Sequence, residues 1–173
     1  MWARLIAAAV LIFVFCFGYV LLFGAPYLPT MKRQVKAAIK LSGLKPGQTL
    51  LELGSGDGRV LVAAAQAGLN VVGYELNPLL FMLSYIRVRR YRKQVRVIFG
   101  NFWQLSWPAC DGIYVFLLPR LMGKLEQKIR AEGLSAVPVI SFAFKFNELL
   151  PVSESHGVFL YRLEPHALRS GKN

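Results

Sequence analysis

The chain has 173 residues, which suits one domain of ordinary size with a short additional segment. Its 21 Lys and Arg residues against 9 Asp and Glu give a net charge of +12, which favours lipid headgroups or acidic partners. The two cysteines indicate no disulfide, and no recognised nucleic-acid module accompanies the charge, so we expect no nucleic-acid partner.

Residues 5–24 are twenty residues without a charge. As a helix they would be about 30 Å long, the thickness of the hydrocarbon core of a bilayer. A cleaved signal peptide is the alternative, but its apolar core is normally shorter, about 7–15 residues, with more basic residues ahead of it than Arg4. We therefore predict an uncleaved, single-pass transmembrane anchor over residues 1–25.

The charges that flank this segment predict its orientation. Arg4 precedes it alone, whereas Lys32, Arg33, Lys36 and Lys40 follow it. Because basic flanking residues stay on the cytoplasmic side, we expect the rest of the chain to face the cytosol, or the matrix if the membrane is mitochondrial.

Residues 26–47 are predicted to form a linker and a short helix. Thr30 is placed to cap a helix over residues 31–41, and Gly43 ends it. We expect the main domain to occupy residues 48–167 and a loose tail to occupy residues 168–173.

A strand predicted over residues 49–53 leads into the stretch LELGSGDGR (residues 51–59), and an alanine-rich helix over residues 60–67 follows it. Three glycines in five residues allow a tight turn and a close approach to a ligand, and the amides at the start of the helix are free to donate. Glu52 precedes this loop, and Glu75 ends the second predicted strand, where an acid can accept both hydroxyls of a ribose. Strand, loop and acids together predict a nucleotide or adenosyl site.

Asn77 and Pro78 then open a helix that carries Leu79, Met82, Leu83 and Ile86 on one face. The basic run that ends it, residues 87–93, suits either a solvated face or a membrane-surface patch. Further strands are predicted over residues 95–100, 112–118 and 137–144, a helix begins at Pro119, and a hairpin with a turn at residues 154–157 spans residues 152–163.

The loop with Glu52 ahead of it resembles motif I of class I S-adenosylmethionine (SAM) methyltransferases, E/D-x-G-x-G-x-G. This resemblance implies an α/β fold with the seven-stranded, Rossmann-like sheet of that class. Other runs are similar to the lysine N-methyltransferases of the ATP synthase c-subunit and the adenine nucleotide translocase: residues 26–30 (PYLPT), 34–35 (QV), 73–78 (GYELNP), 115–119 (VFLLP) and 125–128 (LEQK).

The resemblance implies SAM as the cofactor and supplies most of a binding set. Four residues of the loop region would hold the methionine end of SAM: Glu52, Gly54, Gly56 and Asp57. Glu75 would hold the ribose, and Asn101 and Phe102 would lie near the adenine, where the family typically has Asp-Leu. Ser55, Gly58 and Asn77 complete the predicted cofactor-binding residues. On the substrate side, Ala143 and Leu149 stand where the family has an arginine and a tryptophan.

Methyl transfer from a sulfonium needs little more than alignment and desolvation of the nucleophile. No residue stands out as a general base, since His156 falls in a predicted turn and His166 near the tail. No metal is expected. Three functions remain open: a membrane-anchored protein-lysine methyltransferase, which the resemblance favours; a methyltransferase of a membrane-associated small molecule or lipid; and a non-catalytic SAM-binding module.

Overall fold

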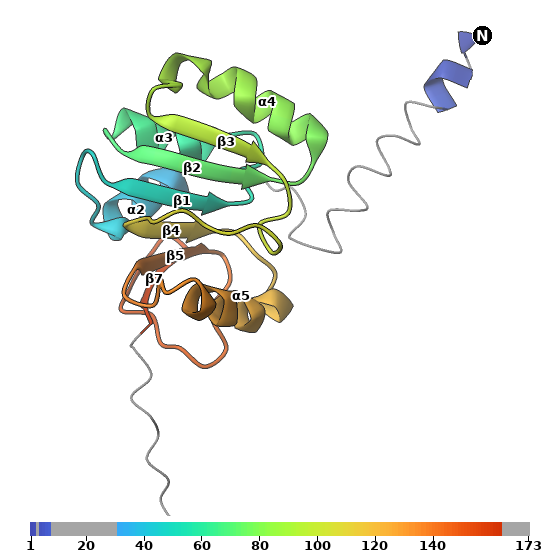
Figure 1. Ribbon diagram of the computed structural model, residues 1–173. Coiled ribbons are helices and arrows are strands. Elements are labelled where there is room, and N and C mark those ends of the chain that lie inside the picture. The colour runs from blue at the N-terminus through green and yellow to red at the C-terminus, as the bar shows by residue number, and fades with distance from the viewer. Residues whose placement is uncertain (3, 8–30, 164–173) are drawn as a thin grey trace, which may run out of the picture.

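A computed structural model describes residues 1–2, 4–7 and 31–163 (Figure 1). From residue 31 onward strands and helices mostly alternate, and the described part ends in a hairpin. In chain order they are α2 (Lys32–Ser42), β1 (Thr49–Leu53), α3 (Arg59–Gln66), β2 (Asn70–Glu75), α4 (Pro78–Val88), the 3₁₀ helix η1 (Arg89–Tyr91), β3 (Val95–Phe99), β4 (Gly112–Val115), α5 (Pro119–Ala131), β5 (Pro138–Phe142), β6 (Ser153–Ser155) and β7 (Val158–Arg162).

The strands form one sheet in the order β3-β2-β1-β4-β5-β7-β6. All neighbours are parallel except β7, which runs antiparallel to both β5 and β6. The predicted α/β sheet of seven strands is therefore confirmed. The strand order changes direction at β1 and β4, and ligands of open α/β sheets bind at the carboxyl ends of strands beside such a point.

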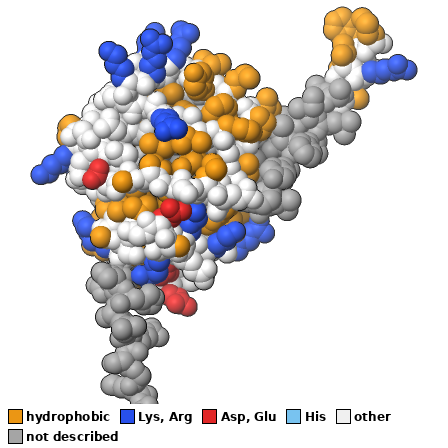
Figure 2. Space-filling view, in the orientation of Figure 1, with side chains coloured by type: hydrophobic (Ala, Val, Ile, Leu, Met, Phe, Trp, Pro, Cys, Tyr) orange, Lys and Arg blue, Asp and Glu red, His pale blue; other side chains and the backbone are white. Residues whose placement is uncertain are grey.

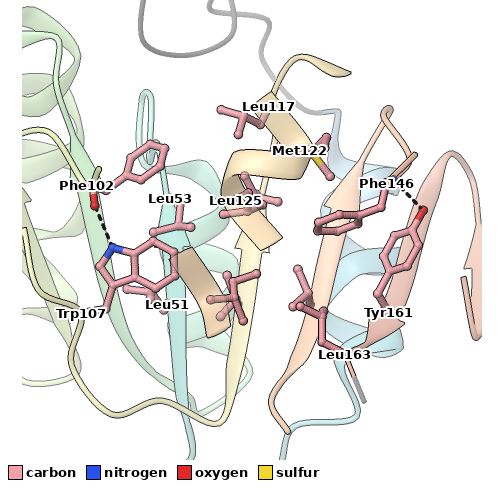
Figure 3. Close-up of a cluster of buried hydrophobic side chains, with 14 of the residues drawn as sticks. Leu51, Leu53, Phe102, Trp107, Leu117, Met122, Leu125, Phe146, Tyr161 and Leu163 are labelled. Atoms are coloured by element: carbon pink, nitrogen blue, oxygen red, sulfur yellow. Dashed lines mark hydrogen bonds between the residues drawn. The ribbon is translucent and has the colours of Figure 1, made fainter. Parts of the chain in front are cut away.

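Each face of the sheet has its own hydrophobic core because successive side chains of a strand point to opposite faces. On one face Leu50 belongs to the cluster beneath α2 and α3. On the other face Leu51 and Leu53 pack with α5 and with the aromatic rings of Trp107 and Tyr161 (Figure 3). The indole of Trp107 donates to the carbonyl of Phe102 (2.9 Å), so the polar end of this buried ring is satisfied.

The hairpin is tighter than the sequence predicts. Glu154 and Ser155 were expected in the turn, but they pair with Phe159 and Val158 as part of β6. Only two residues make the turn, and both have positive φ, 56° at His156 and 75° at the glycine that follows. That combination is typical of the two-residue turns whose twist matches a β-hairpin.

The face of α4 that carries Leu79, Met82, Leu83 and Ile86 is exposed to solvent, whereas Leu80, Ser84 and Val88 are buried. One contact on the buried side of α4 requires a small side chain. A Cβ on Gly58, at the start of α3, would lie 2.9 Å from the Cβ of Ser84, so α3 and α4 approach too closely for larger side chains.

The transmembrane anchor predicted over residues 1–25 lies mostly outside the described residues, as do Thr30, His166 and the tail. Among the residues that the structure does describe, no helix is both long and apolar enough to cross a membrane.

Candidate cofactor site

The glycine loop and Glu75 meet because β1 and β2 are parallel neighbours. Leu53 is in register with Tyr74, so the residues that follow each of them leave the sheet side by side. The amides of Gly54 and Ser55 both donate to the carbonyl oxygen of Tyr74, at 3.0 and 2.8 Å. The loop is thereby held against the carboxyl end of β2.

Glu75 is tied to this loop through its carboxylate. Its Oε2 accepts from the amide of Gly56 (2.7 Å) and its Oε1 accepts from the amide of Asn77 (2.8 Å). Burial raises the pKa of Glu75, and these backbone hydrogen bonds oppose the rise. Since a carboxylate has about four lone-pair sites, each oxygen can still accept a ribose hydroxyl.

The loop amides are less available than the sequence suggests. Gly54, Ser55, Gly56 and Gly58 all donate within the protein, the last to the carbonyl of Ser55 at 2.9 Å. The loop therefore serves chiefly to shape the site and to position Glu75, and side chains must supply much of the ligand contact.

Two buried side chains in the loop region fit that requirement. Within the described part of the chain, Oε2 of Glu52 and Oγ of Ser55 have no hydrogen-bond partner, although both residues are almost fully buried. Gly54 between them has φ of +91°, and the space where a Cβ would stand is open. A bound SAM offers an ammonium and hydroxyl groups to such acceptors, so these residues fit the cofactor.

Asp57 has strong partners inside the protein. Its carboxylate forms ion pairs with Arg59 (2.8 Å) and with Arg87. Hydrogen bonds from both guanidinium groups overcome the effect of burial and lower the pKa of Asp57 to about 2. Whether Asp57 also reaches the methionine end of SAM stays a prediction. The sequence analysis placed Arg87 in the basic run at residues 87–93. Its contact with Asp57 joins residues 30 positions apart, and no local pattern in the sequence predicts such a contact.

The segment predicted near the adenine does lie beside Glu75. The amide of Gly100 donates to the carbonyl of Glu75 (2.9 Å), which brings Asn101 and Phe102 to this edge of the sheet. Oδ1 of Asn101 accepts from the amide of Trp103 (3.0 Å), and the rings of Phe102 and Trp103 stand 4.6 Å apart.

Asn77 is at the site by position, but its side chain caps α4. Its Oδ1 accepts from the amides of Leu79 and Leu80, at 2.9 and 3.2 Å, and the residue is fully buried. Gln34, in the first turn of α2, was not among the predicted site residues. It also has a buried Oε1 without a partner in the described residues, in a helix that packs against α3, β5 and β7.

A family described as the ANTKMT methyltransferase domain matches residues 52–153. The chain belongs to this family. Membership confirms the sequence-based assignment to the methyltransferases, and with it SAM as the cofactor of the site. The matched range contains every residue of the predicted cofactor-binding set.

Two relatives of this ANTKMT methyltransferase domain are lysine methyltransferases by name. The ATP synthase c-subunit lysine N-methyltransferase of Xenopus laevis is 35% identical over 130 residues, which are 73% of this chain and 56% of that protein. The adenine nucleotide translocase lysine N-methyltransferase of Mus musculus is 36% identical over 131 residues, 74% of this chain and 57% of that protein. The chain thus spans a little over half the length of these relatives.

A solved structure confirms the class I methyltransferase fold of this ANTKMT domain. An RNA methyltransferase from Salinibacter ruber, in complex with S-adenosyl-L-homocysteine, superposes with a TM-score of 0.74. The match covers 83% of this chain and 98% of that one at 24% sequence identity.

Glu52→Gln is expected to stabilise the cofactor-free protein near neutral pH. Burial, followed by the charges of Glu75 and Asp57, raises the pKa of Glu52 well above its usual 4.5. The folded protein then keeps a proton that the unfolded chain releases, so stability falls as pH rises above about 4.5, until Glu52 ionises in the folded state too. Glutamine does not titrate, so the Glu52→Gln variant should not lose this stability. Each kcal/mol of unfolding free energy that the variant keeps should raise its Tm by about 2–4 °C relative to wild type.

Calorimetric scans of both proteins between about pH 5 and pH 8 measure this effect. The Tm difference should grow with pH. Parallel curves would mean that Glu52 is not held protonated by its surroundings.

Proposed function

We propose that this chain is a SAM-dependent protein-lysine methyltransferase acting on a membrane protein. The observation that carries the proposal is the buried acid pair at the carboxyl edge of β1 and β2, Glu52 and Glu75, in a chain of this methyltransferase family. The two relatives named above for the ATP synthase c-subunit and the adenine nucleotide translocase support a lysine of a membrane protein as the acceptor.

The acceptor side would be built from three aromatic rings next to the glycine loop. Leu53 is in register with Val115, so Phe116 leaves β4 beside Gly54. The ring of Phe116 stands 5.3 Å from that of Phe142 and 5.7 Å, nearly parallel, from that of Phe144. All three rings are half-buried, which leaves part of each open to a ligand.

The turn that presents Phe144 is held in an unusual conformation. Ala143 has φ of +66°, which is uncommon for a residue other than glycine. Its amide donates to the carbonyl of Gly157 (2.8 Å), and the hydroxyl of buried Ser141 donates to the carbonyl of Phe144 (2.6 Å). Strain kept in place by such bonds is found at ligand sites more often than elsewhere.

Bound SAM supplies an activated methyl group on a sulfonium. The protein must present a neutral amine in line with that methyl group, and apolar surroundings lower the pKa of a lysine amine towards neutrality. The three phenylalanine rings would receive the lysine methylene groups and exclude water from the amine. The lysine ammonium would lose its proton to solvent as it enters the apolar site, so no dedicated base is needed. The neutral amine would then take the methyl group to become a methylammonium, and S-adenosylhomocysteine would be the other product.

We further propose that residues 5–24 anchor the chain in the membrane, with the methyltransferase domain on the cytosolic or matrix side. The absence of charge over twenty residues and the basic residues that follow support this. The linker at residues 25–30 would span at most about 20 Å, so the domain would stay close to the bilayer.

Incubation of the protein with methyl-labelled SAM and total membranes tests the proposed reaction. Label should appear on lysine in a membrane protein.

Phe144→Ala should retain SAM binding and lose most of the transfer, because it removes only one of the three rings proposed to receive the acceptor lysine. Label confined to the lipid extract would instead assign a lipid substrate. SAM binding without any transfer would assign a non-catalytic module.

A further inference from the structure

The outward side of α4 carries an unusual amount of exposed apolar surface. Leu79, Met82 and Ile86 are 45%, 62% and 55% exposed, and Leu83 and Tyr85 are also exposed. We call these five residues the α4 apolar face. Figure 2 shows hydrophobic side chains gathered over this helix.

The face extends onto the neighbouring edge strand. Phe99, the last residue of β3, is 54% exposed, and its ring lies 5.4 Å from that of Phe81 in α4. A contiguous apolar patch of this kind is rare on the surface of a soluble protein unless it contacts something.

Basic residues continue from the end of the same helix. Arg89, Arg90, Arg92 and Lys93 are exposed, and Figure 2 shows Lys and Arg side chains beyond the apolar group. Arg87 is a separate case because it is ion-paired with Asp57. No acidic residue occurs between residues 76 and 110, so the charges that α4, η1 and β3 contribute to this surface are all basic.

We propose that the α4 apolar face docks on an anionic bilayer surface. α4 would lie in the plane of the interface, with its apolar side chains among the lipid headgroups and its four basic residues against lipid phosphates and carboxylates. Apolar area combined with adjacent basic charge is the pattern of helices that bind membranes in this way. Each basic residue near an anionic surface strengthens binding by about fivefold.

Other occupants account for less of the surface. Residues 5–24 could cover the apolar side chains, but they contain no charge to pair with the four basic residues. A second copy of this chain, with a net charge of +12, would likewise bring too little negative charge to pair with the four basic residues. An anionic membrane matches both parts of the surface.

Docking would also orient the site. Leu79 is in the first turn of α4, and Phe99 ends β3, so both lie at the edge of the sheet where the glycine loop and Glu75 stand. A bilayer on this face would bring the entrance to the site to the membrane surface. The inference thus deepens the proposed function, since the acceptor we propose belongs to a membrane protein.

The test uses the full chain in lipid vesicles, with Cys16 and Cys110 replaced by serine so that one new cysteine can carry an environment-sensitive fluorophore. Met82→Cys places the probe on the α4 apolar face. Gln127→Cys places it on an exposed position of α5, on the opposite face of the sheet, and serves as the matched control. Vesicles of phosphatidylcholine, with or without phosphatidylserine, contain nitroxide-labelled lipid as the quencher.

Quenching of the Met82 probe should exceed that of the Gln127 probe several-fold in phosphatidylserine vesicles and should fall in neutral ones. Glutamine at all four basic positions, Arg89, Arg90, Arg92 and Lys93, should weaken docking on these vesicles. The docking constant obtained from the quenching should fall by about fivefold for each residue that reaches the surface. Met82, Gln127 and the four basic residues are exposed, so replacing them should leave the fold intact.

Equal quenching at the two positions would overturn the proposal. The proposal would also be overturned if protection of the Met82 probe depended on the protein-to-lipid ratio rather than on phosphatidylserine. That result would assign the face to contact with a second copy of the chain. Shielding only in the presence of a substrate membrane protein would assign the face to that protein instead. Labelled methyl transfer, assayed with total membranes, reports separately on the proposed function. Transfer there without selective quenching in vesicles refutes docking alone, and selective quenching without transfer to a membrane protein refutes the reaction alone.

Discussion

Glu75→Ala is expected to lower the affinity for SAM by about 100-fold or more. The substitution removes the acceptor proposed for the ribose hydroxyls and also both hydrogen bonds that fix the loop, from the amides of Gly56 and Asn77. Hydrogen bonds to a charged group contribute about 1.5–3 kcal/mol each. The loss of two therefore costs about 3 kcal/mol or more, and a 100-fold change in affinity corresponds to about 2.8 kcal/mol. Isothermal titration calorimetry with SAM measures the effect.

Glu75→Gln and Glu148→Ala supply the controls. The glutamine keeps one acceptor oxygen, so its affinity should fall between those of wild type and the alanine variant. Glu148 is exposed on the segment after β5, and its replacement should leave SAM affinity unchanged. If Glu75→Ala bound SAM as wild type does, with the fold retained, the site would not lie where the acids converge.

Gly58→Ala is expected to reduce the free energy of unfolding by about 2–5 kcal/mol. Gly58 has φ of +79°, and a Cβ there would stand 2.9 Å from the Cβ and 3.0 Å from the Cα of Ser84. The left-handed backbone costs a residue with a Cβ about 1–2 kcal/mol, and overpacking between α3 and α4 adds about 1–3 kcal/mol. Urea denaturation of both proteins gives the difference.

Gly123→Ala is the matched control because Gly123 lies within α5, with nothing within 4 Å of its would-be Cβ. That change should stabilise the protein by about 1 kcal/mol, the helix propensity of alanine over glycine. Adding Ser84→Gly to the Gly58→Ala variant should recover part of the loss. Additive effects of these two changes would place the cost elsewhere than in the contact between the helices.

The order of strands and helices could be predicted because most strands here are short apolar runs, β6 excepted, and the helices have recognisable start or stop residues. The position of Glu75 could also be predicted, since an acid at the end of the second strand must meet the loop after the first. These are consequences of local pattern and of parallel pairing, both of which a sequence records.

The remainder depends on contacts between distant residues. Periodicity predicted the apolar side of α4 but not the direction in which that side faces, and the close approach of Gly58 to Ser84 is a contact that periodicity does not record. The pairing of Arg87 with Asp57 and the use of the loop amides inside the protein likewise follow from tertiary geometry. Each of these contacts joins two segments that are far apart in the sequence, and no periodic pattern predicts that they meet.

The place of β7 has a consequence for the synthesis of the chain. β7 comes after every other described strand in the sequence, yet it lies between β5 and β6 in the sheet. Until β7 leaves the ribosome, β5 offers its unpaired backbone and the apolar side chains of Val139 and Ile140 to any other strand nearby. A nascent chain, or one cut by a protease after residue 150, would therefore be prone to aggregate, and completion of the sheet at β7 closes that route.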